Sequence, residues 1–129
     1  MCIRDRLGAE SSLGATVLAE GISPGKGLLL EAVLTFILVN AVLAVPASGR
    51  AGNLAPIIVG FTLIFCILMG GPLTGASLNP ARTLGPALFT DTLNLFWIYF
   101  TGTFAGAAAA GLIHRVWRSR SPAGHGSAA

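Results

Sequence analysis

The stretch from Gly70 to Arg82 lies between two hydrophobic runs, each long enough to cross a bilayer, and constrains the fold more than any other feature. Its middle is glycine-rich and uncharged. The pattern predicts a helix with Asn79 as N-cap and Pro80 at the first position, where the missing N–H costs nothing. Between membrane spans, irregular backbone survives only where it is buried in protein or lines a water-filled cavity.

Residues 72–89 therefore predict a re-entrant unit that enters the membrane and returns. The segment Leu73–Leu78 reaches about 20 Å when extended, and the midplane of a hydrocarbon core about 30 Å thick lies roughly 15 Å down. A helix from Pro80 to Phe89 covers about 15 Å on the way back. Its positive N-terminal end would face the midplane, where membrane proteins build solute and ion sites.

The composition indicates a membrane protein. Of the 129 residues, 53% are hydrophobic and 10% are charged, whereas soluble domains carry about 25% charged residues. The net charge of +3 comes largely from the C-terminal tail, so nucleic acid is a poor candidate partner. Cys2 and Cys66 are far apart, which suggests neither a disulfide framework nor a metal site. We find no nucleophile–base pair and no spacing for metal ligands, so we expect no enzyme activity and no cofactor.

The expected fold class is an all-α membrane protein with three transmembrane helices and one re-entrant half-helix. Residues 1–26 would form an N-terminal segment and external loop, whose first six residues we interpret as a spurious start. Residues 118–129 would be a disordered tail. The predicted spans cover residues 27–45, 54–70 and 95–116.

Basic residues set the expected orientation. Arg115, Arg118 and Arg120 follow the last span, which places the C-terminus in the cytoplasm by the positive-inside rule. The linker with Arg50 is then cytoplasmic, residues 7–26 are external, and the re-entrant unit enters from outside. We expect a multi-pass protein of the cell membrane.

Two charged residues at membrane depth are candidates for function. Arg82 stands in a chain nearly free of charge, and intramembrane cations usually mark a pathway. The alternative is an arginine that reaches the outer interface. Glu31 needs partners if it is buried, and we favour a brace that accepts from N–H groups of the irregular loop, with Thr35 in the same network. The alternatives are a proton relay or a glutamate that reaches the interface.

The last span contains a small-residue pair, Gly102 and Gly106, spaced as GxxxG. Such a face favours close helix packing. The alternative is a span that is merely rich in alanine and glycine.

The sequence as a whole resembles the aquaporin, or major intrinsic protein, family. The motifs that carry the resemblance are Leu30–Phe36, Gly75–Arg82 and Gly85–Ala87, and the match extends from about Leu7 to Trp117. The family has six spans in two inverted half-repeats, each with an Asn-Pro-Ala loop. The chain looks like the second half-repeat only, so we interpret it as a fragment that lacks the first half and cannot complete the pore alone.

The resemblance implies a passive pore for water and small neutral solutes, in a protein that is usually a homotetramer. Asn79 would be a donor at the midplane, and Arg82 would belong to an outer filter. Water-specific members often carry His at the position of Ile67, so a wider filter could admit ammonia or urea. Thr83 and Tyr99 look unlike the glycerol facilitators. The implied pore-lining residues are Ile67, Gly75, Ala76, Ser77, Leu78, Asn79, Pro80, Ala81 and Arg82.

Two other readings remain open. The chain could be a non-conducting membrane protein that associates with full-length channels through its Gly102/Gly106 face. An antiparallel homodimer could also rebuild an inverted-repeat pore, although the one-sided arginine distribution argues against dual topology.

Overall fold

The computed structural model describes residues 14–47, 52–90 and 92–120. In these residues every regular element is helical. The predicted spurious start, the linker arginine Arg50 and residues 121–129 of the predicted tail lie outside them. The elements are α2 (Pro24–Ala47), η1 (Gly52–Leu54), α3 (Ala55–Thr74), α4 (Pro80–Ala87), η2 (Leu93–Leu95) and α5 (Phe96–Arg120).

Three stretches of the described chain are long and apolar enough to cross a membrane, by length and composition. They are Pro24–Val45, Ala55–Thr74 and Leu93–Ser119. No more than about a third of the residues in each stretch are buried inside the isolated chain, as expected for helices surrounded by lipid or by other membrane helices. The all-α membrane fold class predicted from the sequence is confirmed.

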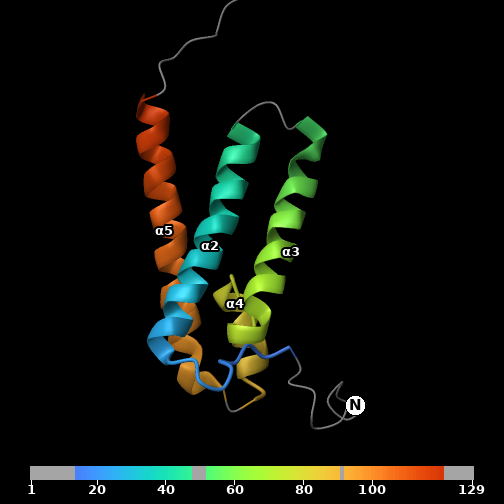
Figure 1. Ribbon diagram of the computed structural model, residues 1–129, viewed down its shortest axis with the longest axis vertical. Coiled ribbons are helices and arrows are strands. Elements are labelled where there is room, and N and C mark those ends of the chain that lie inside the picture. The colour runs from blue at the N-terminus through green and yellow to red at the C-terminus, as the bar shows by residue number, and fades with distance from the viewer. Residues whose placement is uncertain (1–13, 48–51, 91, 121–129) are drawn as a thin grey trace, which may run out of the picture.

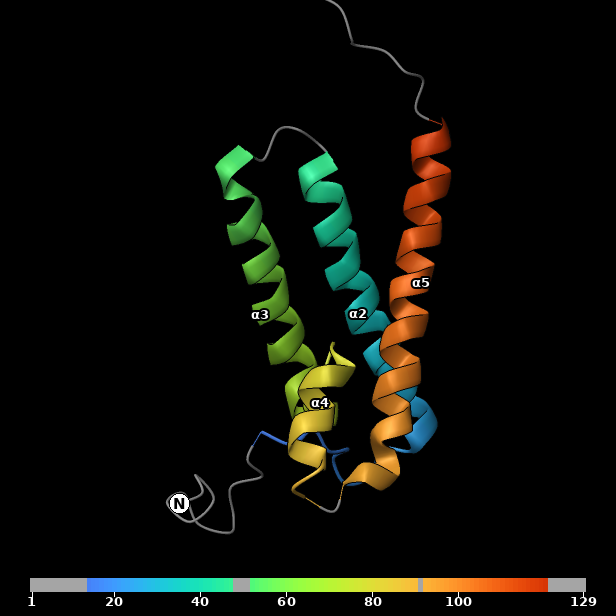
Figure 2. The ribbon, with the colours of Figure 1, turned by 180° about the vertical axis from the view of Figure 1, so that it is seen from behind.

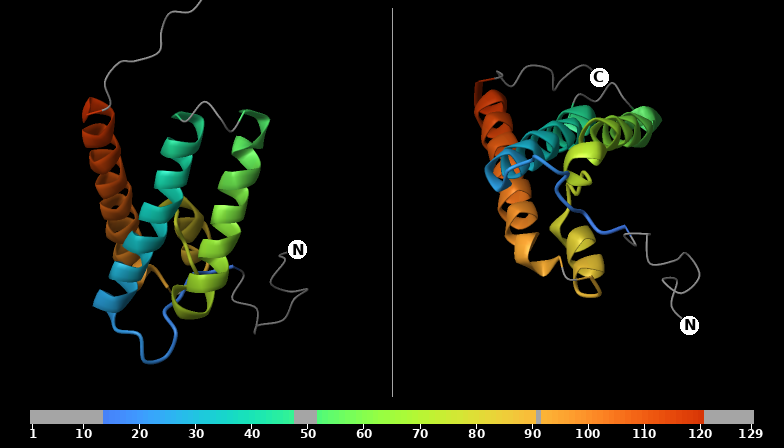
Figure 3. Two further views of the ribbon diagram at one scale, coloured as in Figure 1. Left: turned by 45° about the horizontal axis from the view of Figure 1, so that its top comes forward. Right: turned by 60° about the horizontal axis from the view of Figure 1, so that its bottom comes forward.

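The three long helices form one layer with α2 in the middle (Figures 1 and 2). Helix α2 packs against both α3 and α5. The short helix α4 packs on α5 and lies on one face of the layer, near one end of the bundle (Figures 2 and 3). The chain therefore leaves α3, turns back along the layer, and returns in α4 to the end from which it came.

Helices α2 and α5 approach closely through two glycines. A Cβ atom on Gly102 would lie 2.9 Å from the carbonyl oxygen of Leu28, and one on Gly106 would overlap the carbonyl oxygen of Ala32. Both glycines are buried against α2 within this chain. The proposed docking of this face on other channels is therefore wrong, because α2 already occupies it.

The second long helix ends four residues later than predicted. The sequence suggested that Gly70, Gly71 and Pro72 stop it, but α3 continues through Pro72 to Thr74. Gly75 is the C-cap, with φ of 79° and its N–H bonded to the carbonyl of Gly71 at 3.0 Å. Gly70 serves packing instead, because a Cβ there would overlap the Leu34 side chain.

The return helix is shorter than predicted. Helix α4 ends at Ala87, not at Phe89, one residue after the internal Pro86. The carbonyl of Pro86 accepts the backbone N–H groups of Phe89 and Thr90 at 2.9 and 3.0 Å, which closes the helix with a tight turn. Proline breaks the hydrogen-bond ladder at its own position, which explains the early end.

Candidate functional site

The candidate site is the loop of residues 75–79 that joins α3 to α4. We expected an extended arm from Leu73 to Leu78, but Leu73 lies in α3 and the loop is compact. Besides Gly75, two non-glycine residues adopt a left-handed backbone conformation: Ala76 has a φ of 43° and Leu78 has a φ of 53°. Such residues usually mark strain that the surrounding structure must hold, and they concentrate at functional sites.

Glu31 of α2 holds the N–H groups of this loop. Its side chain is fully buried. Oε1 accepts the hydroxyl of Thr74 at 2.7 Å and the backbone N–H of Ser77 at 3.0 Å, and Oε2 accepts the backbone N–H of Leu78 at 3.0 Å. This geometry matches the brace interpretation, and the complete burial excludes a glutamate that reaches the membrane interface.

Arg82 of α4 holds the carbonyl groups of the same loop. Its Nη1 donates to the carbonyl oxygen of Ala76 at 3.0 Å and to that of Gly75 at 3.3 Å. The guanidinium is thus held at the loop and is not extended away from it. Arg82 is exposed on the surface of this chain. Because both bonds use Nη1, further N–H donors remain for a solute.

Asn79 caps α4 and presents an amide group at the surface. Its backbone is extended, with φ of −152°, and its Oδ1 accepts the backbone N–H of Ala81 at 2.9 Å. Pro80 stands at the first helical position, as expected. Since Oδ1 is occupied by the cap, the NH₂ group is the part of the side chain that can donate to a solute. Asn79, Ala81 and Arg82 are all exposed.

Comparison with known proteins identifies the family. The model of the family described as "Major intrinsic protein" matches residues 4–114. The chain belongs to the major intrinsic protein family. The match covers all four described α-helices up to His114 and includes the loop, Glu31 and Arg82.

Three plant relatives resemble this major intrinsic protein. Aquaporin TIP3-2 of Zea mays is 46% identical over 100 residues, covering 75% of the chain and 38% of the relative. A probable aquaporin TIP-type of Medicago sativa is 43% identical over 109 residues, covering 82% and 44%. Aquaporin TIP2-3 of Arabidopsis thaliana is 43% identical over 108 residues, covering 78% and 43%. The chain thus spans about two-fifths of the length of these relatives.

Several residues of the major intrinsic protein site were not predicted from the sequence. The hydroxyl of Tyr99, on α5, donates to the carbonyl oxygen of Thr74 at 2.9 Å, and Tyr99 is 1% exposed. This bond satisfies an orphan carbonyl at the C-terminal end of α3. Thr83 and Thr16 form a hydroxyl cluster with Ser77. A buried tyrosine or threonine between apolar residues gives no local sign of such a distant partner.

One predicted site residue, Thr35, lies outside the expected network. Thr35 does not share the Glu31 network: it is buried, yet its Oγ1 has no hydrogen-bond partner among the described residues. Thr35 follows Glu31 by four residues, but the loop atoms reach only the glutamate, whose longer side chain extends to them. Ile67 is 41% exposed on α3, so its side chain is free to line a pore, and that role stays a prediction. Ala76, Ser77 and Leu78 are buried and contribute backbone groups.

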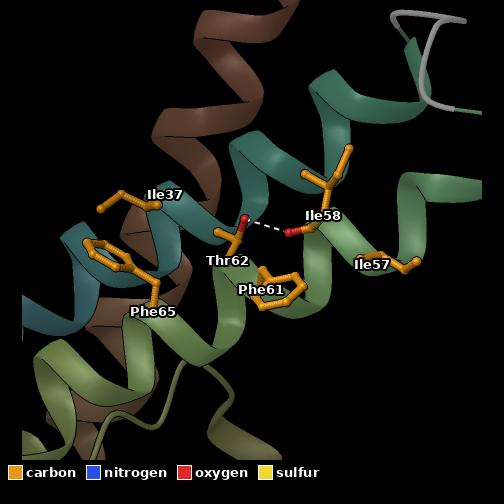
Figure 4. A pocket seen from close by; sticks show the side chains of 6 residues that line it. All are labelled: Ile37, Ile57, Ile58, Phe61, Thr62 and Phe65. Atoms are coloured by element: carbon orange, nitrogen blue, oxygen red, sulfur yellow. Dashed lines mark hydrogen bonds between the residues drawn. The ribbon is translucent and has the colours of Figure 1, made fainter.

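A groove elsewhere on this major intrinsic protein has a different character (Figure 4). It lies along α2 and the first half of α3, away from the loop. The only polar side chain in its lining belongs to Thr62, whose hydroxyl donates to the carbonyl of Ile58 at 2.9 Å. This lining fits hydrocarbon or another apolar helix better than a polar solute. The lining residues are Ile37, Ile57, Ile58, Phe61, Thr62 and Phe65.

Proposed function

We propose that this chain supplies the second half of a passive membrane channel for water and small neutral solutes. The observation that supports the proposal best is that the backbone groups of the 75–79 loop bond to two oppositely charged side chains. Its N–H groups at Ser77 and Leu78 face the Glu31 carboxylate, and its carbonyls at Gly75 and Ala76 face Arg82. The family itself consists of channels and not enzymes, which agrees with a non-catalytic role.

The proposed mechanism uses hydrogen bonds and one fixed charge. A water molecule would accept from the Asn79 amide at the positive end of α4 and later from the Arg82 guanidinium. Carbonyl oxygens of the loop would accept its protons. A neutral solute exchanges its hydrogen bonds in bulk water for these with little change in free energy. Cations and protons are repelled by the positive charge of Arg82. No covalent step and no cofactor are involved.

The pore is proposed to be completed by a second half-repeat. Asn79 and Arg82 are exposed on the face of the layer that carries α4, and the relatives are more than twice as long as the matched segment. A second Asn-Pro-Ala helix placed against this face would enclose the passage. We further propose a homotetramer, with the C-terminus of each chain in the cytoplasm and the protein in the cell membrane.

The selectivity is proposed to extend beyond water. Ile67 would stand opposite Arg82 in the completed filter and carries no hydrogen-bonding side chain, whereas Ala76 would border the filter through the backbone carbonyl that accepts from Arg82. An apolar wall leaves room for ammonia or urea but gives a larger polar solute few partners. The filter would therefore reject solutes by size and charge.

Vesicle swelling tests the proposed function directly. The full-length protein that carries this sequence would be reconstituted in liposomes, and stopped-flow light scattering would follow osmotic water and urea flux. We expect water permeability at least about tenfold above that of empty liposomes, which corresponds to a barrier that is lower by at least about 1.4 kcal/mol. Permeability equal to that of empty liposomes, for protein shown to be folded, would contradict the channel function.

Replacing Arg82 by valine is expected to admit cations. A fixed unit charge about 4 Å from a passing cation, at an effective dielectric constant of about 20, raises the energy of that cation by about 4 kcal/mol, or roughly a thousandfold in rate. Arg82→Val should therefore raise proton and sodium leak by about that factor, measured with pH-sensitive and sodium-sensitive dyes in the same liposomes.

The matched control is Arg115→Val. Arg115 is exposed near the far end of α5, away from the loop, so its removal should leave both leaks unchanged. Equal leaks in the Arg82 variant and in the wild type would remove Arg82 from cation exclusion.

A further inference from the structure

The segment of residues 14–22, here called the strap, crosses the end of the bundle where the loop lies (Figures 1 and 3). It leads into α2 and forms no helix of its own. The backbone N–H of Ala19 donates to the carbonyl of Leu73, near the end of α3, at 2.9 Å. Thr16 is only 3% exposed, although it belongs to a connecting segment. A buried polar side chain in a loop calls for an explanation from its partners.

The hydroxyl of Thr16 begins a chain of hydrogen bonds that ends on the backbone of Asn79. Its Oγ1 lies 2.8 Å from Oγ1 of Thr83, which lies 2.5 Å from Oγ of Ser77. The Ser77 hydroxyl donates to the carbonyl oxygen of Asn79 at 2.8 Å. The chain thus links a strap residue to a residue 67 positions later and then to the loop.

The direction of this chain follows from proton counting. Each hydroxyl carries one proton. Ser77 uses its proton on the Asn79 carbonyl, so Thr83 must donate to Ser77, and Thr16 must then donate to Thr83. Thr16 is therefore the first donor in this series of hydroxyl hydrogen bonds, here called the hydroxyl relay. Hydrogen bonds aligned in one direction strengthen each other in a low-dielectric interior.

The strap also contacts the backbone of Gly75, whose carbonyl group holds Arg82. A Cβ atom on Gly75 would lie 2.9 Å from Cα of Thr16, so the two backbones are in close contact. The carbonyl of Gly75 is one of the two acceptors of Arg82. Thr16 is thus linked indirectly to both halves of the site: to Asn79 through the hydroxyl groups of Thr83 and Ser77, and to Arg82 through the backbone of Gly75.

We propose that Thr16 is a positioning residue that determines the selectivity of the channel, by holding Asn79 and Arg82 in register through Thr83, Ser77 and Gly75. The inference rests on the proposed channel function. Water is small enough to pass whichever position the Arg82 guanidinium takes. The passage of a larger solute depends on how far the guanidinium can move away from the pathway. Loosening the strap therefore raises urea passage more than water passage.

The test compares three threonine variants of the full-length protein in liposomes. Thr16→Val keeps the shape and removes the donor, and it should raise the ratio of urea to water permeability about fivefold, the factor that corresponds to one hydrogen bond of about 1 kcal/mol. Thr16→Ser keeps the hydroxyl and should restore the wild-type ratio. Thr62→Val is the matched control, because its hydroxyl bonds only within α3 in the apolar groove of Figure 4, and the ratio should not change.

A double-mutant cycle and an exchange measurement make the outcome decisive. If the relay carries the effect, Thr16→Val should add nothing in a Thr83→Val background. Hydrogen exchange at residues 75–79 should accelerate in Thr16→Val and not in Thr16→Ser, whether or not solute flows. A wild-type ratio and wild-type exchange in Thr16→Val would overturn the proposal. A folded wild-type protein that conducts nothing would instead overturn the channel function, and unchanged exchange would then overturn the relay separately.

Discussion

Replacing Glu31 by glutamine is expected to disorder the loop at residues 75–79 and to reduce water permeability at least about tenfold, although the change removes no heavy atom. Both carboxylate oxygens accept N–H groups, one from Ser77 and one from Leu78. An amide must turn its NH₂ group towards one of them, which sets two donors against each other. Losing one bond to a charged acceptor costs about 1.5–3 kcal/mol, and the buried unsatisfied N–H costs about 1–3 kcal/mol more.

The measurement combines vesicle swelling with hydrogen exchange at Ser77 and Leu78. Glu20→Gln is the matched control, because Glu20 is exposed on the strap and the same chemical change there should leave both readouts unaffected. Wild-type water flux together with protected amides at both positions in Glu31→Gln would show that the carboxylate is not required. The positive-φ residues Ala76 and Leu78 argue against that outcome, because a strained backbone persists only where surrounding groups hold it in place.

The elements that follow from local chemistry were predictable from the sequence. Asn79 and Pro80 occupy positions that their side chains favour in any helix start, so the cap and the first turn of α4 needed no tertiary information. The three spans follow from hydrophobic length. Glu31 was identified as a brace because a buried carboxylate must find donors, and a Gly-rich loop offers free N–H groups.

The predictions from the sequence failed at positions where tertiary packing determines the structure. Gly70 and Pro72 suggested a helix end, yet Gly70 makes room for Leu34 and the helix continues to Thr74. A glycine needed for close approach looks the same in sequence as a glycine needed for a turn. Thr35 was expected beside Glu31 because of its spacing, but helical spacing places two residues on one face without giving them a shared partner.

The hydroxyl relay could not be predicted at all. Thr16 and Thr83 are 67 residues apart and their bond depends on the path of the strap over the loop. No local pattern distinguishes a threonine with such a distant partner from one whose hydroxyl bonds within its own helix, as that of Thr62 does. Long-range pairs of neutral side chains are therefore the part of this site that requires a structure.

Gly106→Ala is expected to destabilise the folded chain by about 2 kcal/mol, although alanine is the better helix former. The added methyl group would overlap the carbonyl oxygen of Ala32 and lie 3.0 Å from the backbone nitrogen of Phe36. Backbone atoms cannot rotate away as a flexible side chain does, so α5 must move off α2. Overpacking of this kind costs about 1–3 kcal/mol or more, whereas the gain in helix propensity is at most about 1 kcal/mol.

Gly111→Ala provides the matched control on the same helix. A Cβ atom on Gly111 meets nothing within 4 Å, so this variant keeps the gain in helix propensity without the clash, and its stability should equal or exceed that of the wild type. Thermal unfolding of the full-length protein in detergent, followed by circular dichroism, would compare the two variants. The α2–α5 contact positions Tyr99 and Glu31 against Thr74 from opposite helices, so the Gly106 variant should also lose water permeability. Equal stability of the two alanine variants would show that α2 and α5 are not held at backbone contact in the assembled channel.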